Sequence, residues 1–441
     1  MKKNSLTQAI CGALISSACI APAYAGEAEL LQKIEKLAAE LEAIKAELAA
    51  SRKKTEQGTD APLAVNQSAA AAALPASGNV DAQIQELRKE LTKTVISGYG
   101  EVAYSRPRNA SEQAQTDVKR AVIGVTHRFD SKTKMVAEFE WEHAIASKGD
   151  DGEAAVEQLY VEHELKPGIS AKAGLFLIPA GFMNTSHEPT AFYGVHRNFV
   201  ETAIIPTTWR EAGLGVSGSH LNGLSWDLGL TTGFNLTKWD ATSADGRESP
   251  LGAIHQEGQN AKSKDLSLHA ALNWRGVPGL LVGASAFSGK AGHGTTAFAA
   301  NDARVTLWEL HGRYNPGPLD LSALYARGTI SNTTDLNLTF VGNPNPVPST
   351  FTGWYVQAAY LAWKDSNYSL TPFVRYEQFN TAKSYAPVPL GLGVLPTDDE
   401  KVMTLGLSFR IGEGVVLKTD YQKFRLDNSR DRYNLGVGYA F

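Results

Sequence analysis

Hydrophobic positions follow two different periods along the chain, and the change falls near residue 94. From Thr94 to the C-terminus, apolar or aromatic residues alternate with polar or small ones, which is the period of a β-strand with one buried face. This alternation predicts about 16 strands. Their ranges are 94–105, 117–128, 133–146, 154–166, 169–177, 211–219, 224–238, 264–275, 279–290, 303–314, 318–330, 351–363, 368–380, 400–411, 414–425 and 430–441.

The connections between these strands alternate between short and long. The short ones are rich in Gly, Pro, Asn or Asp, as at 166–168, 276–279 and 412–414, which is typical of tight turns. The long ones fall near 106–116, 178–210, 239–263, 291–302, 331–350 and 381–399. Tight periplasmic turns and long external loops are typical of a barrel in an outer membrane. The sequence therefore predicts an all-β fold, a transmembrane antiparallel β-barrel over 94–441.

The last predicted strand runs to the final residue, Phe441, without losing its alternation. A terminal strand usually frays unless it is paired on both sides. Closure of the barrel against 94–105 would supply the second neighbour.

Before residue 94 the apolar spacing is helical. Apolar residues follow each other at intervals of 4, 3, 4, 3 and 4, which is an a/d seam over nearly three heptads: Leu30, Ile34, Leu37, Leu41, Ile44 and Leu48. A single amphipathic helix would need a wider apolar stripe, so the pattern favours a coiled coil over 26–56. Ile and Leu are mixed at both positions, which leaves a trimer open. Residues 57–79 are rich in Ala, Pro, Ser and Gly and are predicted to be a linker, and 80–93 are predicted to form a second short helix.

The first residues have the order of a secretory signal. Lys2 and Lys3 precede an apolar stretch over 9–20, and the small-residue cleavage pattern ends at Ala25, so 1–25 is predicted to be a signal peptide. A short membrane anchor and a lipoprotein signal at Cys19 are the alternatives. Both cysteines, Cys11 and Cys19, lie in this segment, so no disulfide or thiolate metal site is expected in the mature protein.

Charge and hydropathy narrow the class of protein further. The 42 Lys and Arg fall to 40 without Lys2 and Lys3, against 46 Asp and Glu, which gives the mature chain a net charge of about −6. That balance disfavours nucleic acid as a partner. After the N-terminal segment no run of about 18 apolar residues is available for a spanning helix.

Alternation also predicts which side chains face lipid and which face a wet lumen. In 133–146, Phe139 and Trp141 fall on one face with Met135 and Ala137, and charged residues fall on the other. Charged side chains at every second position are costly in lipid, so they are predicted to line the lumen. The predicted acidic wall consists of Glu138, Glu140, Glu142, Glu162 and Glu164. The predicted basic wall consists of Arg120, Arg128, Arg375, Arg410, Lys418, Arg430 and Arg432. Two such walls create a transverse field that orients charged solutes, although ordinary hydrated wall charge is the alternative for any single residue.

The longest connection, 178–210, is too apolar and aromatic for a solvated loop. It is the third external connection, and folding inward would make it the narrowest point of the lumen. Its charged and titratable residues are the candidate constriction: His187, Glu188, His196, Arg197, Glu201 and Arg210. Arg197 and Arg210 are the predicted anion-attracting residues, and the histidines are expected to gain charge near pH 6.5. The spacing of His187, Glu188 and His196 fits no compact metal motif, so no metal or other cofactor is predicted.

The segment HEPTAFYGVHRNFVETAIIPTTWREAGLGVSG within 187–218, together with the terminal YAF, makes 94–441 resemble bacterial outer-membrane porins, most closely the phosphate-selective group. The N-terminal heptads before a barrel resemble trimeric dicarboxylate-type porins with a periplasmic coiled coil. The resemblance implies a homotrimeric, 16-stranded diffusion channel constricted by its third external loop, with a C-terminal Phe that the barrel-assembly machinery recognises. Phosphate-preferring members carry dense Lys and Arg in the constriction. Loop 178–210 is mixed in sign, so the phosphate specificity of those members is not carried over to this chain.

The function predicted from these features is passive diffusion of small hydrophilic solutes, with anions as a candidate class, across a bacterial outer membrane. A structural alternative is a tether between the outer membrane and the cell wall, but the coiled coil has only about 30 residues, roughly 45 Å of helix. A membrane-embedded hydrolase is the third alternative. No elbow or triad spacing marks its Ser, His and Asp residues, so no enzyme activity is predicted.

Overall fold

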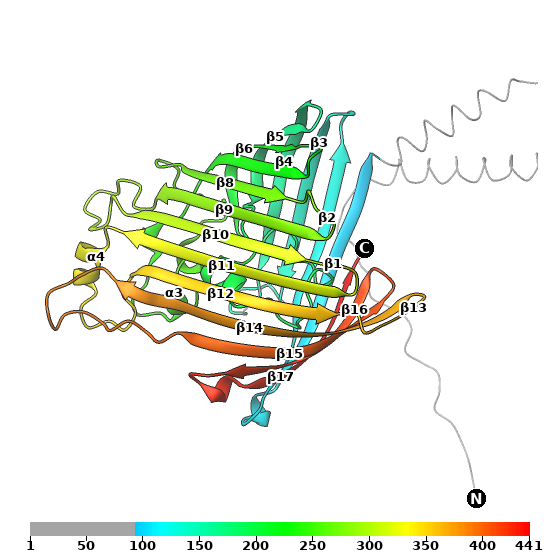
Figure 1. The fold of residues 1–441 in the computed structure, drawn as a ribbon. Coiled ribbons are helices and arrows are strands. Elements are labelled where there is room, and N and C mark those ends of the chain that lie inside the picture. Colours follow the sequence, from blue (N-terminus) through cyan, green and yellow to red (C-terminus); the bar gives the residue numbers. More distant parts are fainter. Residues whose placement is uncertain (1–92, 151) are drawn as a thin grey trace, which may run out of the picture. The chain divides into compact units, whose positions relative to one another are not determined.

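The computed structural model describes residues 93–150 and 152–441. Within them, 17 strands form one antiparallel sheet that closes on itself (Figure 1). The strands are β1 (Thr94–Pro107), β2 (Gln115–Arg128), β3 (Thr133–Glu142), β4 (Ala154–Lys166), β5 (Ile169–Leu177), β6 (Arg210–Ser219), β7 (Leu224–Thr231), β8 (Ser267–Trp274), β9 (Leu280–Lys290), β10 (Arg304–Tyr314), β11 (Leu319–Ser331), β12 (Pro348–Tyr360), β13 (Trp363–Asp365), β14 (Tyr368–Tyr385), β15 (Glu400–Ile411), β16 (Val415–Phe424) and β17 (Arg432–Ala440). The predicted signal peptide, coiled coil and linker lie outside the described residues, as does nearly all of the predicted helix 80–93.

Two of these strands, β12 and β13, together occupy one strand position in the barrel. β12 and the three-residue β13 pair with successive parts of β14, so β13 continues β12 after a short break. The barrel therefore has 16 strand positions. The predicted all-β fold with about 16 antiparallel strands is confirmed.

The barrel closes between its first and last strands. β1 pairs with β17 in register from Tyr99 opposite Ala440. Backbone hydrogen bonds between Gly98 and Phe441 run in both directions, at 3.1 and 2.9 Å. The alternation reaches the last residue because that residue is still part of the sheet.

Gly98 makes this closure possible because it has no side chain. A Cβ there would lie 2.6 Å from the carbonyl oxygen of Val122 and 2.9 Å from the Phe441 ring. Gly100 likewise leaves room for the Tyr439 ring, since a Cβ at residue 100 would lie 2.7 Å from the Tyr439 hydroxyl oxygen. Two terminal aromatic rings are thus accommodated beside β1.

Two predicted strands end earlier than the alternation indicates. β3 stops at Glu142 and β7 stops at Thr231, although alternation continues to residues 146 and 238. After β7 the chain packs Phe234 and Leu236 into a buried cluster and forms the 3₁₀-helix η3 (Leu236–Lys238). Burial of aromatic and aliphatic residues outweighs continued strand pairing at this point.

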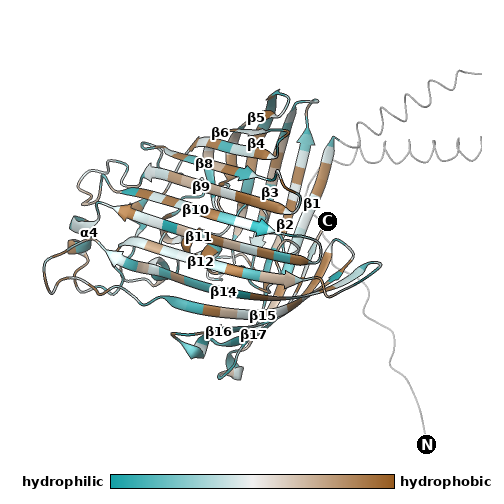
Figure 2. Cartoon of the chain, in the orientation of Figure 1, coloured by the Kyte–Doolittle hydropathy of each residue, from teal (hydrophilic) through white to brown (hydrophobic). Residues whose placement is uncertain are grey.

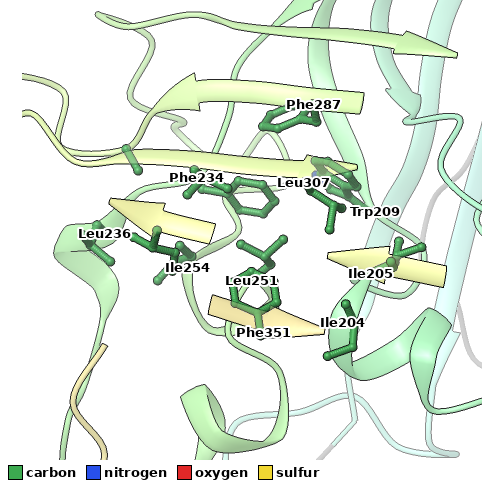
Figure 3. Packing of buried hydrophobic residues seen from close by; sticks show 14 of the residues in the cluster. Ile204, Ile205, Trp209, Phe234, Leu236, Leu251, Ile254, Phe287, Leu307 and Phe351 are labelled. Carbon is green, nitrogen blue, oxygen red and sulfur yellow. The ribbon is translucent and has the colours of Figure 1, made fainter. Parts of the chain in front are cut away.

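The buried cluster lies within the sheet near the long loops and includes Trp209, Phe234, Leu251 and Phe287 (Figure 3). It joins residues of β9, β10 and β12 to those of the loops that follow β5 and β7. The other short elements are η1 (Ser111–Gln113), η2 (Val200–Ile204), α3 (Asp245–Glu248), η4 (Gly252–Ile254), α4 (Thr334–Thr339) and η5 (Asn428–Arg430). None of the helices in the described ranges is long and apolar enough to cross a membrane.

Apolar and polar side chains alternate along the strands, as Figure 2 shows by hydropathy. On β3, Phe139 and Trp141 are exposed while Glu140 between them is buried. On β15, Leu405 and Leu407 are exposed while Thr404 and Ser408 are buried. An apolar exterior and a polar interior are the reverse of a soluble barrel with a solid apolar core.

Candidate pore constriction

The connection between β5 and β6, residues 178–209 and here called L3, packs against the inside of the barrel. Its short π-helix η2 contacts β11, β12 and β14. Apolar residues explain this position, because Val200, Ile204 and Ile205 are all buried in the cluster of Figure 3.

Glu201 is the polar anchor of η2. Its carboxylate accepts hydrogen bonds from the backbone amides of Phe182 and Met183, at 2.5 and 2.8 Å, and from Asn198 Nδ2 at 2.7 Å. The Tyr355 hydroxyl of β12 donates a fourth at 2.9 Å. A buried carboxylate with this many donors holds both limbs of L3 and the wall together.

The middle of L3 contacts the other side of the sheet. His187 Nε2 lies 2.7 Å from Glu157 Oε1 on β4, and the His187 ring packs edge-on against Tyr99 of β1. His196 Nε2 lies 3.0 Å from Ser105 Oγ, also on β1. Because η2 is fixed to β11, β12 and β14, L3 spans the lumen from one wall to another.

Backbone groups of L3 are held by the last strands. The amide of Val195 donates a 2.7 Å hydrogen bond to Asp420 on β16, and the amide of Phe199 donates one of 2.9 Å to Glu377 on β14. Arg410 of β15 donates to the carbonyl oxygen of Thr190. L3 is therefore tied to the wall on several sides.

The two predicted anion-attracting arginines form contacts within the protein. Arg197 is 7% exposed and donates to Thr207, to Thr208 Oγ1 at 3.0 Å and to the carbonyl oxygen of His187 at 3.2 Å. Arg210, the first residue of β6, lies 3.1 Å from Glu257. The two guanidinium groups therefore stabilise L3 and its exit, and do not form an open fork.

Glu188 is half-buried, and its carbonyl oxygen accepts a hydrogen bond from the Ala191 amide at 2.8 Å. The six predicted constriction residues lie in L3 or directly after it, and they differ in solvent exposure. Glu201, Arg197, Arg210 and His187 are buried, whereas Glu188 and His196 are half-buried.

The acidic wall is concentrated on β3 and β4. Arg120 of β2 lies between one of its carboxylates, Glu140 at 3.4 Å, and Glu101 of β1 at 2.8 Å. Glu138 accepts a hydrogen bond from Gln158 at 2.5 Å. Arg120 therefore belongs to the acidic side and neutralises part of it.

The other wall residues are spread along the barrel. Glu162 pairs with Lys134 at 2.9 Å, and Glu164 lines a cavity near the short turns. Glu142 and Arg128 are each the last residue of their strand, and because β2 and β3 are antiparallel they lie at opposite ends of this strand pair. Arg430 is in η5, where it stacks over Phe424 and lies 3.8 Å from Glu400.

The predicted basic wall is mixed in sign. Arg375 pairs with the buried Glu377, two residues further along β14. Lys418 lies 3.5 Å above the Phe192 ring of L3, on the same strand as Asp420. Arg432 donates to Gln422 at 2.7 Å. The predicted separation into an acidic and a basic wall is therefore only partial, because these strands carry carboxylates as well.

Sequence reasoning missed the carboxylates that bind L3: Glu157, Glu377 and Asp420. All three lie on the buried face of a strand. The alternation of β14 and β16 already puts Glu377 and Asp420 on the same face as Arg375 and Lys418. Glu157 was harder to place, because a register shift between Glu138 and Phe139 interrupts the pairing of β3 with β4.

The expectation that the L3 histidines gain charge near pH 6.5 is wrong. Burial, followed by the charge of Arg197, lowers the pKa of His187. Burial, followed by the charge of Arg432, lowers the pKa of His196 to about 3. A buried imidazole next to a guanidinium is neutral at physiological pH.

L3 residues line cavities toward both ends of the barrel. One of about 640 Å³ lies near the long loops and is lined by Phe199, Thr202, Arg247, Asn380 and Arg430, among others. Another of about 350 Å³ lies near the short turns and is lined by Glu164, Ser170, Pro179, Asp227 and Asn273, among others. L3 thus contributes to the walls of spaces on either side of it.

No protein-family model matches the chain. An uncharacterized protein of Aquifex aeolicus (strain VF5) is 27% identical over 376 residues, which cover 82% of this chain and 83% of that protein. OmpF of Salmonella typhi, solved in complex with daunomycin, has a TM-score of 0.54 at 14% identity, covering 79% of this chain and 97% of that one. The outer-membrane channel DcaP of Acinetobacter baumannii has a TM-score of 0.49 at 11% identity, covering 79% and 97%.

The likeness to OmpF agrees with the closed antiparallel barrel described above. The chain has a porin-like fold, a closed antiparallel β-barrel with 16 strand positions.

Proposed function

We propose that the protein is an outer-membrane channel through which small hydrophilic solutes diffuse passively, with L3 as its narrowest point. The observation that carries this proposal is the attachment of L3 to opposing parts of the wall, through Glu201 with Tyr355 and through His187 with Glu157. A loop held in this way narrows the lumen. Passive diffusion requires no catalytic group and no cofactor.

The outer surface supports insertion in a membrane. Exposed aromatic residues lie beside the short turns: Phe129, Trp274, Tyr314, Tyr360, Trp363, Tyr368, Tyr439 and Phe441. Exposed Leu and Val residues occupy the strands further along. An apolar band bounded by aromatic residues matches the lipid and interfacial layers of a bilayer.

The solute class follows from charge on the lumen side. Arg410 and Arg432 supply positive charge near L3, which supports small anions as a candidate class. Glu138 and Glu140 lie across from them on the acidic side and favour cations. We therefore propose weak charge selectivity, which the reversal potential in a salt gradient measures directly.

Assembly as a homotrimer is also part of the proposal. It is supported by the heptad spacing of 26–56 and by the resemblance of 94–441 to trimeric porins. Native mass measurement in detergent tests it, and a monomer at micromolar concentration would contradict it. Deletion of 27–93 should weaken the trimer and leave the barrel folded.

The C-terminal residue is the proposed recognition element for the barrel-assembly machinery. Phe441 is 71% exposed although its backbone is paired with Gly98. A free ring on a paired backbone is accessible to a partner. Phe441→Ala should lower the amount of folded protein in the outer membrane and leave refolding in detergent unaffected.

Single-channel conductance in a planar bilayer tests the channel and the role of L3 together. The full chain should form open, ohmic channels, and deletion of 186–201 should raise their conductance because the loop is removed from the lumen. A folded barrel that conducts no ions would contradict the channel. Channels whose conductance is unchanged by the deletion would show that L3 does not set the narrowest point.

A further inference from the structure

His187 of L3 meets two carboxylates of the barrel wall, Glu138 on β3 and Glu157 on β4. One potential ligand atom from each lies within 4.8 Å of the others. His187 Nε2 is 2.7 Å from Glu157 Oε1, and both side chains are at least nine-tenths buried. The spacing of Glu138, Glu157 and His187 in the sequence did not predict that the three residues would lie together.

The hydrogen bonds of His187 fix which ring nitrogen carries the proton. Nδ1 lies 3.1 Å from the carbonyl oxygen of Asn184, which can only accept a hydrogen bond. Nδ1 therefore carries the proton, and Nε2 of the neutral ring presents a lone pair. Nε2 lies 2.7 Å from Glu157 Oε1.

Glu157 Oε1 receives no hydrogen bond from any residue in the described ranges. Two atoms with lone pairs thus lie 2.7 Å apart in a buried position. Such a contact is repulsive unless a positive species lies between them. That species is either a proton or a metal ion.

The outer contacts of all three side chains are those of a metal site. The second oxygen of Glu157 accepts a hydrogen bond from the Tyr99 hydroxyl at 3.4 Å. One oxygen of Glu138 accepts a hydrogen bond from Gln158 at 2.5 Å. Together with the bond from His187 Nδ1 to Asn184, each side chain has one atom held by a neighbour and one ligand atom left, which is how proteins orient metal ligands.

The local charge favours a divalent cation. Three carboxylates, Glu101, Glu140 and Glu157, lie around Arg120, and Glu138 lies near Glu157 and His187. Arg120 pairs with Glu101 and Glu140, and no ion pair joins a guanidinium to Glu138 or Glu157 among the described residues. Arg197 donates to hydroxyl and carbonyl oxygens, and Arg210 pairs with Glu257. Within the described residues, the two carboxylates nearest His187 are therefore in no direct ion pair with a guanidinium, although the charges of Arg120, Arg197 and Arg210 act on Glu157.

We propose that Glu138, Glu157 and His187 bind one divalent transition-metal ion of the zinc type, with water completing the shell. One imidazole nitrogen and two carboxylate oxygens suit zinc, whereas calcium takes about 6–8 oxygens. Zinc lies about 2.0–2.2 Å from such ligands, so tetrahedral ligand atoms lie roughly 3.4 Å from each other. On binding, the 2.7 Å between His187 Nε2 and Glu157 Oε1 has to widen, and Glu138 has to move to a similar distance from both. The ion joins the middle of L3 to the wall and stiffens the constriction.

Zinc titration of the full-length protein in detergent, after treatment with a chelator, tests the site. We expect one tightly bound Zn²⁺ per chain by calorimetry. His187→Gln and Glu138→Gln should each weaken binding by about 100-fold or more, because even outer-shell partners are worth about 10–100-fold. Glu162→Gln is the matched control, since Glu162 also lies on β4 but pairs with Lys134.

Folding of each variant is checked by its heat-dependent mobility in detergent gels, so that loss of the barrel is not read as loss of the site. Co²⁺ in place of Zn²⁺ should give the visible bands of a four-coordinate nitrogen and oxygen site in the wild type and in Glu162→Gln only. No binding of Zn²⁺ to the folded wild type at submillimolar concentration would overturn the proposal and leave a proton as the bridge. Equal binding by wild type, His187→Gln and Glu138→Gln would overturn it too, because the ion would then lie elsewhere.

Discussion

The Tyr355 hydroxyl donates a 2.9 Å hydrogen bond to Glu201, and both residues are buried where L3 meets β12. This single contact joins the loop that enters the lumen to the strand against which it packs. Because the other carboxylate oxygen binds the amides of Phe182 and Met183, loss of Glu201 would free both limbs of the loop.

Glu201→Gln should leave the barrel closed and loosen L3. An amide cannot accept all four of these hydrogen bonds, and each unsatisfied buried group costs roughly 1–3 kcal/mol. We expect larger fluctuations of the open-channel current and faster proteolysis within 186–201. Glu188→Gln is the control, because Glu188 is half-buried and its side chain is not the anchor of η2. Equal current noise in the two variants would contradict the anchoring role.

Cysteine substitution tests which residues face the lumen. The only native cysteines, Cys11 and Cys19, lie in the predicted signal peptide. Cysteine at Glu142 or Glu162 should react with a membrane-impermeant thiol reagent in reconstituted vesicles. Cysteine at Phe139 or Trp141 should be protected by lipid. The opposite pattern would mean that the face assignment of β3 and β4 is off by one residue.

The pH dependence of the constriction should lack a histidine step near 6.5. His196 is half-buried among Ser105, Arg432 of β17, Lys119 of β2 and Arg375 of β14. Burial and these cations lower its pKa to about 3, so it stays neutral from pH 8 down to about 4. The reversal potential should therefore have the same pH profile in wild type and in His196→Gln.

The same shift predicts how stability changes with pH. Above about pH 6.5 the imidazole is neutral in both folded and unfolded chains, so it adds no pH dependence. As pH falls from about 6.5 toward 3, only the unfolded chain gains the proton, and the folded state is destabilised. The unfolding temperature of wild type should fall more steeply in this window than that of His196→Gln. Parallel curves would contradict the lowered pKa.

Gly98→Ala should disturb the seam between β1 and β17. The new Cβ would lie 2.6 Å from the Val122 carbonyl oxygen, so backbone must move, at a cost of roughly 1–3 kcal/mol. We expect a lower temperature for conversion from the folded to the unfolded band in detergent gels. Gly312→Ala on β10 is the matched control, because its nearest contact would be an ordinary 3.7 Å. Equal conversion temperatures would show that the seam tolerates the shift.

The local pattern of residues was enough to predict the barrel. Alternation along each strand, turn residues at one end and long connections at the other are local features, and each reports directly on a two-residue period or a tight turn. Closure could also be predicted, because a strand that keeps its alternation to Phe441 needs a partner. The inward packing of the loop after β5 followed from its apolar content, since Val200, Ile204 and Ile205 have no favourable place in solvent.

Only the tertiary structure decided the chemistry of the constriction. Strand register and a bulge in the pairing of β3 with β4 bring Glu138 and Glu157 to the same place, and the path of L3 brings His187 to both. Residues 19 to 49 positions apart in the chain meet there because the sheet pairs neighbouring strands and the loop folds back onto them. Burial then reverses the expected titration of His196, since an imidazole that is titratable in water loses its hydration beside Arg432. Residue types and their spacing along the chain are enough to predict where strands and turns form. The distances between side chains of different strands, and their exposure to solvent, are set only when the barrel closes around L3.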